Sequence, residues 1–260
     1  HEPNNPNSIA QNDVTAIYED SHGALWVGTR DAGLTRIETS KSENAQYAHF
    51  RHDPNDANSL SDNNITVITE SRDKPGELWV GTFRGGLHRL DERSGRFVRL
   101  KTDSKDAASL NASRIRSIHQ SLANSHHLWI GSQANGLYRL DKATMTSERV
   151  LLAKAQDAPV ALTEIKFVHE SPRHPGILWI GDRQGGLWRF NPDVEAGKDR
   201  LMQFRFQNSQ KDSLINSTVF SICEPDDGYF WVGTNAGLSR FDPSTGFFKN
   251  YDWSDGLPVA

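Results

Sequence analysis

Residues 78–91 read LWVGTFRGGLHRLD, and the same pattern occurs five times in the 260-residue chain. Each copy has Trp-(Val or Ile)-Gly, followed six or seven residues after the tryptophan by Gly-Leu-x-Arg. The tryptophans are Trp26, Trp79, Trp129, Trp179 and Trp231, so they are separated by 53, 50, 50 and 52 residues. A fixed period near 50 residues indicates a repeat architecture. Residues present in every copy are expected to have structural roles, and function is expected where the copies differ.

The second copy predicts four short strands joined by tight turns. Its apolar and β-branched stretches are separated by Pro-Gly, Gly-Gly and Ser-Gly pairs, which are typical of antiparallel hairpins. The expected strands cover residues 64–70, 78–82, 87–91 and 96–100. No stretch longer than one strand has the 3.6-residue apolar period of a helix. A repeated unit of about 40 to 50 residues with four strands is typical of one β-propeller blade.

The sequence therefore predicts an all-β protein, a β-propeller with five visible four-stranded antiparallel blades. We expect residues 1–260 to form a single propeller domain or fragment, with blades at approximately 12–51, 63–101, 113–153, 163–207 and 216–253. Residues 1–9 align with the linker at 52–60, and residues 254–258 resemble the start of another linker. With partial linkers at both ends, the blades are expected to be a fragment of a larger, seven-bladed propeller.

The repeated residues are expected to hold the blades together. A tryptophan on the second strand fills the wedge between blades, and deleting such a ring typically costs about 3–5 kcal/mol. The glycine two residues later leaves room for the adjacent blade, and the glycine before the leucine is expected at positive φ. The recurrent arginines are Arg36, Arg89, Arg139, Arg189 and Arg240. We favour a hydrogen-bonded strut between blades over an anion-binding ring, because the third strand lies outside the central channel.

The composition argues against several classes of function. A net charge of −4 and a pI of about 6.2 make nucleic acid or an anionic membrane an unsuitable main partner. No apolar run approaches the roughly 18 residues of a membrane span. The single Cys223 is expected to be a small buried residue of a first strand. The pair His126-His127 reads as a solvated turn, and zinc, Walker and nucleophile-elbow motifs are absent, so no metal, cofactor or catalytic residue is expected.

The unit Gly-x-Leu-Trp-(Val/Ile)-Gly-Thr…Gly-Gly-Leu-x-Arg-(Leu/Phe)-Asp resembles the two-component regulator propeller repeat. The linkers at residues 58–65 and 108–115 and the Asp-Gly-Leu-Pro motif at 255–258 strengthen the resemblance. It implies the non-catalytic, periplasmic sensor part of a membrane-bound bacterial signalling protein, often recognising glycans or their breakdown products. Family members usually hold seven-bladed propellers and pass the signal to a histidine kinase, a hybrid kinase–regulator or a diguanylate cyclase.

Eight side chains near the loops between second and third strands are the candidate ligand-binding residues. They occupy equivalent positions in successive repeats and yet differ in type. They are Arg30, Phe83, Arg84, Gln133, Asn135, Arg183, Gln184 and Asn235. Planar hydrogen-bonding groups beside an aromatic ring suit a sugar or a uronate. An oligosaccharide or another small polar ligand is therefore the expected partner.

Two other functions remain open on the sequence alone. A propeller lyase or glycosidase would need a carboxylate pair, for which Asp31 and Asp182 are candidates. A protein-interaction scaffold would need no small ligand. Whatever the function, the apolar faces of terminal blades are expected to be covered by neighbouring blades or by a second copy of the chain, because open faces promote association.

Overall fold

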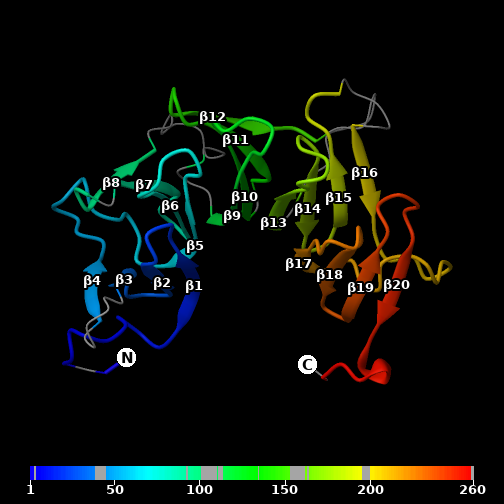
Figure 1. Ribbon diagram of the computed structural model, residues 1–260, viewed down its shortest axis with the longest axis horizontal. Coiled ribbons are helices and arrows are strands. Elements are labelled where there is room, and N and C mark those ends of the chain that lie inside the picture. Colours follow the sequence, from blue (N-terminus) through cyan, green and yellow to red (C-terminus); the bar gives the residue numbers. More distant parts are fainter. Residues whose placement is uncertain are drawn as a thin grey trace. The chain divides into compact units, whose positions relative to one another are not determined.

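The computed structural model describes residues 1–2, 4–38, 45–91, 93–100, 110, 114–133, 135–152, 162, 164–194 and 200–258. These residues form five four-stranded antiparallel sheets, and the strands of each sheet follow one another as they do in the chain (Figure 1). A short 3-10 helix, Trp253–Asp255, follows the last strand. The prediction of an all-β protein with five four-stranded blades is confirmed.

Each repeat contributes one sheet. The first contains β1 (Val14–Glu19), β2 (Leu25–Thr29), β3 (Leu34–Glu38) and β4 (Gln46–Phe50). The second contains β5 (Ile65–Glu70), β6 (Glu77–Thr82), β7 (Leu87–Asp91) and β8 (Arg96–Arg99). The third contains β9 (Arg114–Gln120), β10 (His127–Gln133), β11 (Leu137–Asp141) and β12 (Thr146–Val150). The fourth contains β13 (Ile165–Glu170), β14 (Leu178–Asp182), β15 (Gly186–Phe190) and β16 (Leu201–Phe204). The fifth contains β17 (Val219–Cys223), β18 (Phe230–Thr234), β19 (Gly237–Phe241) and β20 (Phe248–Tyr251).

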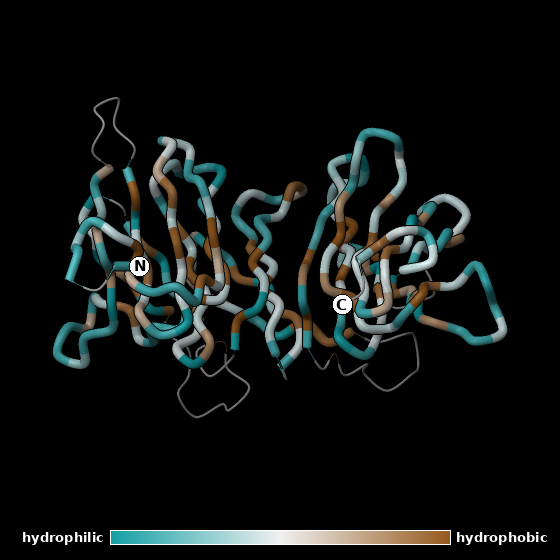
Figure 2. The backbone as a smooth tube through the Cα atoms, turned by 90° about the horizontal axis from the view of Figure 1, so that it is seen from below, coloured by the Kyte–Doolittle hydropathy of each residue, from teal (hydrophilic) through white to brown (hydrophobic). Residues whose placement is uncertain are grey.

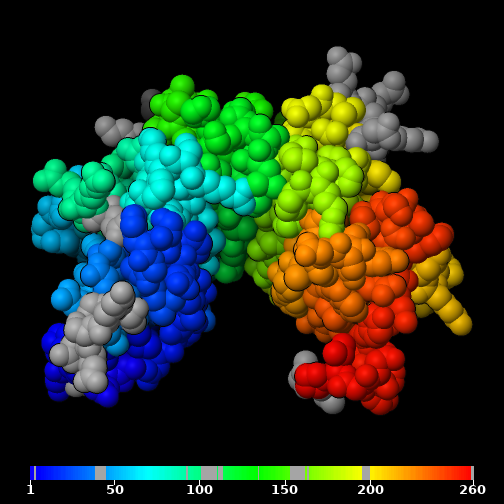
Figure 3. Space-filling view, in the orientation of Figure 1, coloured from blue at the N-terminus to red at the C-terminus, as the bar shows by residue number. Residues whose placement is uncertain are grey.

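The chain divides into two compact units. The first comprises residues 1–120, 125–133 and 138–149 and holds the first three sheets almost entirely. The second comprises residues 121–124, 134–137 and 150–260 and holds the last two sheets. Within the first unit β1 lies beside β5 and β5 lies beside β9, so the first strands form the line along which repeats meet. Figure 3 shows the first repeat (blue) in direct contact with the second (cyan).

Apolar core clusters lie between the first and second, the second and third, and the fourth and fifth repeats. Hydrophobic residues concentrate on the strands, whereas most of the connecting loops are hydrophilic (Figure 2). Trp26 is fully buried in a cluster that contains Ile65 and Leu78 of the second repeat. Trp79 and Trp179 occupy the same place in the clusters that follow along the chain. The second-strand tryptophan therefore fills the space between repeats, as predicted.

The glycine of the Trp-x-Gly motif allows this close approach. A Cβ built on Gly28 would lie 2.6 Å from Ile65 Cγ2 of the next repeat, and one built on Gly81 would lie 2.6 Å from Ile115 Cγ2. Both distances are well inside van der Waals contact, so the packing requires glycine. The hairpin glycine before the leucine, Gly33, has a φ of +80°. The structural roles predicted for both glycines are confirmed at these positions.

The fifth sheet corrects two predictions. Trp231 is half-buried rather than buried, and Cys223, expected in the core, is exposed. The two residues pair across β17 and β18 and lie on one face of the sheet. The other face carries Val219 and Phe230, which pack on Trp179 of the fourth repeat. Among the described residues no further strand packs on the Trp231 face, and this explains why both side chains reach solvent.

The recurrent arginines act as struts, chiefly within their own sheet. Three of them form ion pairs with a carboxylate of the same repeat, namely Arg36–Glu38, Arg89–Glu77 and Arg139–Glu148. The guanidinium of Arg240 lies 4.1 Å from the centroid of the Tyr229 ring. The arginines are struts, as predicted. The prediction placed their contacts between blades, whereas these ion pairs lie inside one sheet. Among these arginine contacts, the one that reaches another repeat is the hydrogen bond from Arg89 Nη1 to Met145 Sδ of the third repeat, at 3.7 Å.

A side chain at or just beyond the end of the first strand ties each repeat to the turn of the repeat before it. Its carboxylate or amide oxygen accepts a hydrogen bond from the turn that precedes the second strand. The pairs are Ser21–Glu70, Arg72–Gln120, Leu122–Glu170 and Ser171–Glu224, at 2.6 to 2.8 Å. We refer to these four pairs as the latches. In three of the latches the acceptor is a carboxylate, and hydrogen bonds to a charged acceptor typically contribute about 1.5–3 kcal/mol, so the latches reinforce the apolar contacts between repeats.

Candidate functional site

The loops between the second and third strands begin at equivalent backbone positions. The N–H groups of Arg30, Phe83, Arg183 and Asn235 each donate to the carbonyl oxygen of the residue just before the first strand of their own sheet, at 2.9 to 3.1 Å. We call these loops, which start at residues 30, 83, 133, 183 and 235, the rim loops. In these four sheets the rim loop therefore lies beside the start of the first strand, and in the third sheet Gln133 pairs with Arg114, the first residue of β9.

A bulge at the start of the first strand turns one more side chain out of the regular pairing. In β9 the register shifts opposite Gly131 and Ser132, so that Arg116 is skipped in the ladder. In β13 the same shift skips Lys166. A bulge redirects the extra residue relative to a flat strand and is common beside functional sites. Both cations therefore lie beside a rim loop. The regular alternation of side chains along a strand does not predict this position.

Four residues of the first unit form a connected cluster at two rim loops. The guanidinium carbons of Arg114 and Arg116 lie 4.7 Å and 5.3 Å from the centroid of the Phe83 ring. Arg116 Nη2 donates a hydrogen bond to Gln133 Oε1 at 2.7 Å. We call these four residues the Phe83 cluster. It joins two of the predicted site residues, Phe83 and Gln133, and adds two arginines, so cations, an aromatic ring and an amide stand together.

The other predicted residues of the first two rim loops are arranged differently. Arg30 Nε donates to the Asp13 carboxylate at 2.5 Å, and this hydrogen bond raises the pKa of Arg30. Arg84 has an exposed side chain, and its backbone N–H donates to Asp62 Oδ2 at 2.6 Å. Arg30 is thus held within its own sheet, whereas Arg84 extends into solvent. Asn135 is half-buried in the same loop as Gln133.

In the second unit a buried carboxylate organises the rim. Glu164 accepts hydrogen bonds from Lys166 Nζ at 2.6 Å and from Arg183 Nη1 at 3.2 Å. Lys166 also lies 5.6 Å from the centroid of the Phe220 ring. This arrangement parallels the Phe83 cluster, with a cation from a bulge lying over an aromatic ring. The predicted residues Gln184 and Asn235 are exposed on their loops.

Asp182, one of the two carboxylates considered for catalysis, has a structural role. It is buried, and its oxygens accept backbone N–H bonds from Glu164, Gln184 and Gly185 at 2.6 to 3.0 Å. The equivalent residue of the second repeat is Thr82, whose hydroxyl makes hydrogen bonds to the corresponding turn of its own repeat. Asp182 therefore caps a rim loop, and its geometry adds no support for a glycosidase or lyase.

The variable residue of Gly-Leu-x-Arg is buried in every repeat, although its type changes each time. These residues are Thr35, His88, Tyr138, Trp188 and Ser239. His88 Nε2 lies 2.7 Å from Ser61 Oγ and accepts the Ser61 N–H at 3.2 Å, which fastens the incoming linker to the sheet. Burial, aided by Arg99, lowers the pKa of His88 to about 4. Variation between copies therefore also marks where a linker is fitted, and not only where function lies.

Two further findings concern ions and membranes. Within the described part of the chain, no group of three or more His, Cys, Asp and Glu side chains is placed to hold a metal ion. In the same residues, no helix has the length and apolar character required to cross a bilayer.

Comparison with known families supports the resemblance seen in the sequence. Residues 8–31, 59–84 and 213–236 each match the family described as "Two component regulator propeller". The matched segments are the linker, first strand and second strand of the first, second and fifth repeats. These three segments are therefore similar to repeats of this family. No curated protein matches the sequence.

Solved structures share the fold. The extracellular domain of the hybrid two-component system BT3049 of B. thetaiotaomicron is 20% identical with a TM-score of 0.74, over 95% of this chain and 31% of that one. The corresponding domain of BT4673 of the same organism is 19% identical with a TM-score of 0.71, over 93% of this chain and 31% of that one. The β-propeller domain of Cps50 (Swd1) from Myceliophteria thermophila is 13% identical with a TM-score of 0.62, over 92% and 73%. The chain is thus a β-propeller that spans about a third of the first two relatives.

Proposed function

We propose that this chain is the ligand-sensing, extracytoplasmic propeller part of a bacterial membrane-bound signal-transduction protein and that it is not itself an enzyme. The support is the match of three segments to two-component regulator propeller repeats. Two proteins with the same fold are extracellular domains of hybrid two-component systems. In a bacterium with two membranes the corresponding compartment is the periplasm.

We place the ligand at the rim loops, and the observation that carries this proposal is the Phe83 cluster. Arg114 and Arg116 are held on one aromatic ring, and Arg116 is bound to the Gln133 amide. Guanidinium groups bind carboxylates through paired hydrogen bonds, and amides bind hydroxyl groups. An oligosaccharide that contains a uronate offers both kinds of group. Arg84 extends from the adjoining position of the Phe83 loop and adds a further cation there.

Calorimetric titration of the domain with digalacturonate and with the neutral disaccharide galactobiose tests this proposal. We expect the acidic sugar to bind and Phe83→Ala to weaken its binding at least tenfold, because both arginines lose the ring that orients them. Phe247→Ala is the matched control, since Phe247 is an exposed phenylalanine in the turn between β19 and β20. Equal affinity in wild type and Phe83→Ala would exclude the Phe83 cluster as the site.

The same samples separate the proposal from its two alternatives. Cleavage of digalacturonate or of longer oligosaccharides by the isolated domain would identify an enzyme. Stable capture of a protein partner, with no response to any sugar, would identify an interaction scaffold. A sensor module binds its ligand and releases it unchanged.

A further inference from the structure

A pocket of about 770 Å³ lies between the first and second repeats, at the end of the sheets opposite the rim loops. Its polar lining comes from the turns before the second strands, the turn after β7 and the strand arginine of the first repeat. The residues with charged or titratable side chains are His22, Arg36, Lys74, Glu77, Asp91 and Arg93. We call it the turn pocket. A volume of this size is in the range of small-ligand sites, roughly 300–1,000 Å³.

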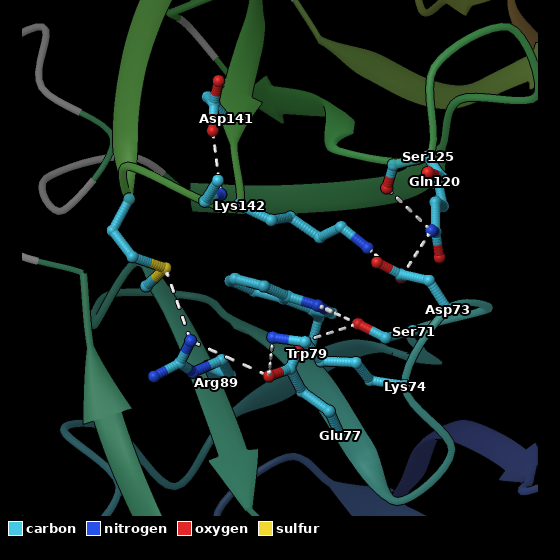
Figure 4. A network of polar contacts seen from close by, with 12 residues as sticks. Ser71, Asp73, Lys74, Glu77, Trp79, Arg89, Gln120, Ser125, Asp141 and Lys142 are labelled. Atoms are coloured by element: carbon cyan, nitrogen blue, oxygen red, sulfur yellow. Dashed lines mark hydrogen bonds and ion pairs between the residues drawn. The ribbon is translucent and has the colours of Figure 1, made fainter.

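At the corresponding junction between the second and third repeats, charged and polar side chains of the two repeats meet (Figure 4). There Lys142 forms an ion pair with Asp73, which also accepts a hydrogen bond from Gln120 at 2.9 Å. Met145 Sδ lies 3.7 Å from Nη1 of Arg89, the strand arginine of the second repeat. An ion pair and a methionine therefore occupy the place where the first junction has a pocket.

Two departures from the repeat pattern accompany the turn pocket. His22 stands where the second repeat has Asp73, and Gly95 stands where the third repeat has Met145. The counterpart of Lys142 is Glu92, which lies outside the described residues. Gly95 has a φ of +65° and Met145 a φ of +57°, so the two turns share a conformation and differ in the side chain. Glycine has no side chain, so the first junction lacks a counterpart of the methionine that lies beside Arg89 at the second junction.

The carboxylates of the pocket are already bound within the second repeat. Glu77 Oε1 accepts a hydrogen bond from Ser71 Oγ at 2.9 Å, and Glu77 Oε2 lies 3.7 Å from Arg89 Nη1. Asp91 Oδ1 accepts the backbone N–H of Ser94 at 3.1 Å and so caps its own hairpin. Partners of this kind leave fewer oxygen lone pairs to bind a cation.

Two of the three cations of the pocket are exposed, and the third is held in place by its neighbours. Lys74 has a side chain that is 61% exposed, with Glu77 at 3.8 Å, and Arg93 is exposed. Arg36 is paired with Glu38 and has its guanidinium 5.6 Å from the centroid of the Trp26 ring, which holds it in a fixed place at the pocket. Three cationic groups from three different elements therefore converge on one cavity.

We propose that the turn pocket binds a small anionic ligand that carries two or more carboxylate or sulfate groups. Arginine and lysine side chains bind such groups by charge-assisted hydrogen bonds, and the neighbouring peptide groups bind the polar remainder. The proposal is independent of the rim site, because it concerns the other end of the same sheets and shares no residue with the Phe83 cluster.

Nuclear magnetic resonance of the ¹⁵N-labelled domain tests this site directly. Digalacturonate is expected to shift the amide resonances of Lys74, Gly76 and Arg93, whereas neutral galactobiose and the cation putrescine are expected to leave them in place. The double variant Lys74→Ala/Arg93→Ala should weaken binding to these amides at least tenfold, since charge-assisted bonds are lost from exposed residues that the fold does not need. Phe83→Ala should leave the same shifts unchanged.

A filling variant gives the independent check. Gly95→Met installs the residue that the third repeat carries at this turn, and a Cβ there would lie 3.6 Å from Phe50 Cε1, an ordinary contact. We expect it to abolish the shifts at Lys74 and Arg93 while the remaining spectrum stays that of the folded domain. Absence of these shifts in the wild type, unchanged affinity in both variants, or preferential binding of putrescine would each overturn the proposal.

Discussion

The guanidinium carbon of Arg114 lies 4.7 Å from the centroid of the Phe83 ring. A side chain at the start of the third sheet therefore rests on the rim loop of the second sheet. Arg116 approaches the same ring to 5.3 Å because the β-bulge takes it out of the strand pairing. The contact fixes two cations in space before any ligand arrives, which lowers the entropic cost of binding.

This relationship predicts a measurable coupling energy. In a double-mutant cycle with Arg114→Ala and Phe83→Leu, we expect a coupling of about 0.5–1 kcal/mol in the free energy of unfolding, the range for exposed cation–π pairs. Urea unfolding of the four proteins measures it. Phe83→Tyr should retain the coupling because the aromatic face is kept. Additive effects in the cycle would show that the two side chains are adjacent without attracting each other.

Removal of two rim cations should affect binding far more than folding. For Arg84→Ala combined with Arg183→Ala we expect at least a tenfold loss of affinity for an acidic ligand, since each charge-assisted hydrogen bond contributes roughly 1.5–3 kcal/mol. The side chain of Arg183 is 59% exposed, and the buried Glu164 keeps its hydrogen bond from Lys166 when Arg183 is removed, so the loss of stability should be small. Calorimetric titration with oligosaccharide and uronate pools measures the loss, and the two single variants report each unit separately. Unchanged affinity in the double variant would place the ligand elsewhere.

The buried His88 should make stability depend on pH in a defined direction. Its folded pKa of about 4 lies below the unfolded value of 6.5, so the unfolded chain takes up the proton first as the pH falls. The stabilisation is complete above pH 6.5 and is lost between pH 6.5 and about 4. We expect wild type to lose about 2–3 kcal/mol more than His88→Gln between about pH 7.5 and about pH 4.5, in urea titrations. Equal losses in the two proteins would contradict the assignment.

The Asp73–Lys142 pair should respond unequally to removal of its two partners. The Lys142 side chain is 5% exposed and that of Asp73 is 28% exposed. Burial raises the pKa of Asp73, but hydrogen bonds from Lys142 and Gln120 outweigh it, so the carboxylate is stabilised overall. Asp73→Asn leaves a buried ammonium without its counter-ion and should destabilise the fold by about 2–3 kcal/mol, whereas Lys142→Met should cost about half as much. Guanidinium unfolding gives both values, and the reverse order would refute the argument.

The close approach of repeats at Gly28 should make this position intolerant of any side chain. The added Cβ of Gly28→Ala would lie 2.6 Å from Ile65 Cγ2. Overpacking of this kind should cost about 3 kcal/mol. Gly23→Ala is the control, because its Cβ would meet nothing within 4 Å, and only its φ of +82° opposes the change, at about 1 kcal/mol. Similar stabilities for the two variants would mean that the junction relaxes around the methyl group.

The period of the sequence was sufficient to predict the blades because every strand boundary is marked locally. The Gly and Pro turns and the Trp-x-Gly motif recur in phase, and local signals of that kind do not depend on distant residues. Burial was harder to predict. Trp231 carries the same motif as Trp79, yet it is half-buried, because its exposure depends on which strand packs against that face of the sheet.

The candidate site was predictable only in outline. Phe83 and Gln133 could be chosen from their rim-loop positions, but their link runs through Arg116, whose direction is set by a bulge. Regular alternation of side chains along a strand does not foresee that irregularity. The converse error concerns His88. Its position differs between the copies, which suggests a functional role, but the side chain is buried and hydrogen-bonds to the incoming linker.

The latches give the array a polarity along the chain. In each pair the turn belongs to one repeat and the acceptor to the repeat that follows, as with Ser21 and Glu70 or Leu122 and Glu170. During synthesis, the turn of a repeat therefore has no acceptor until some 50 further residues have left the ribosome, a delay of roughly 3–10 s at ordinary elongation rates. The hydrogen bonds of each latched turn are therefore completed only when the following repeat has been synthesised.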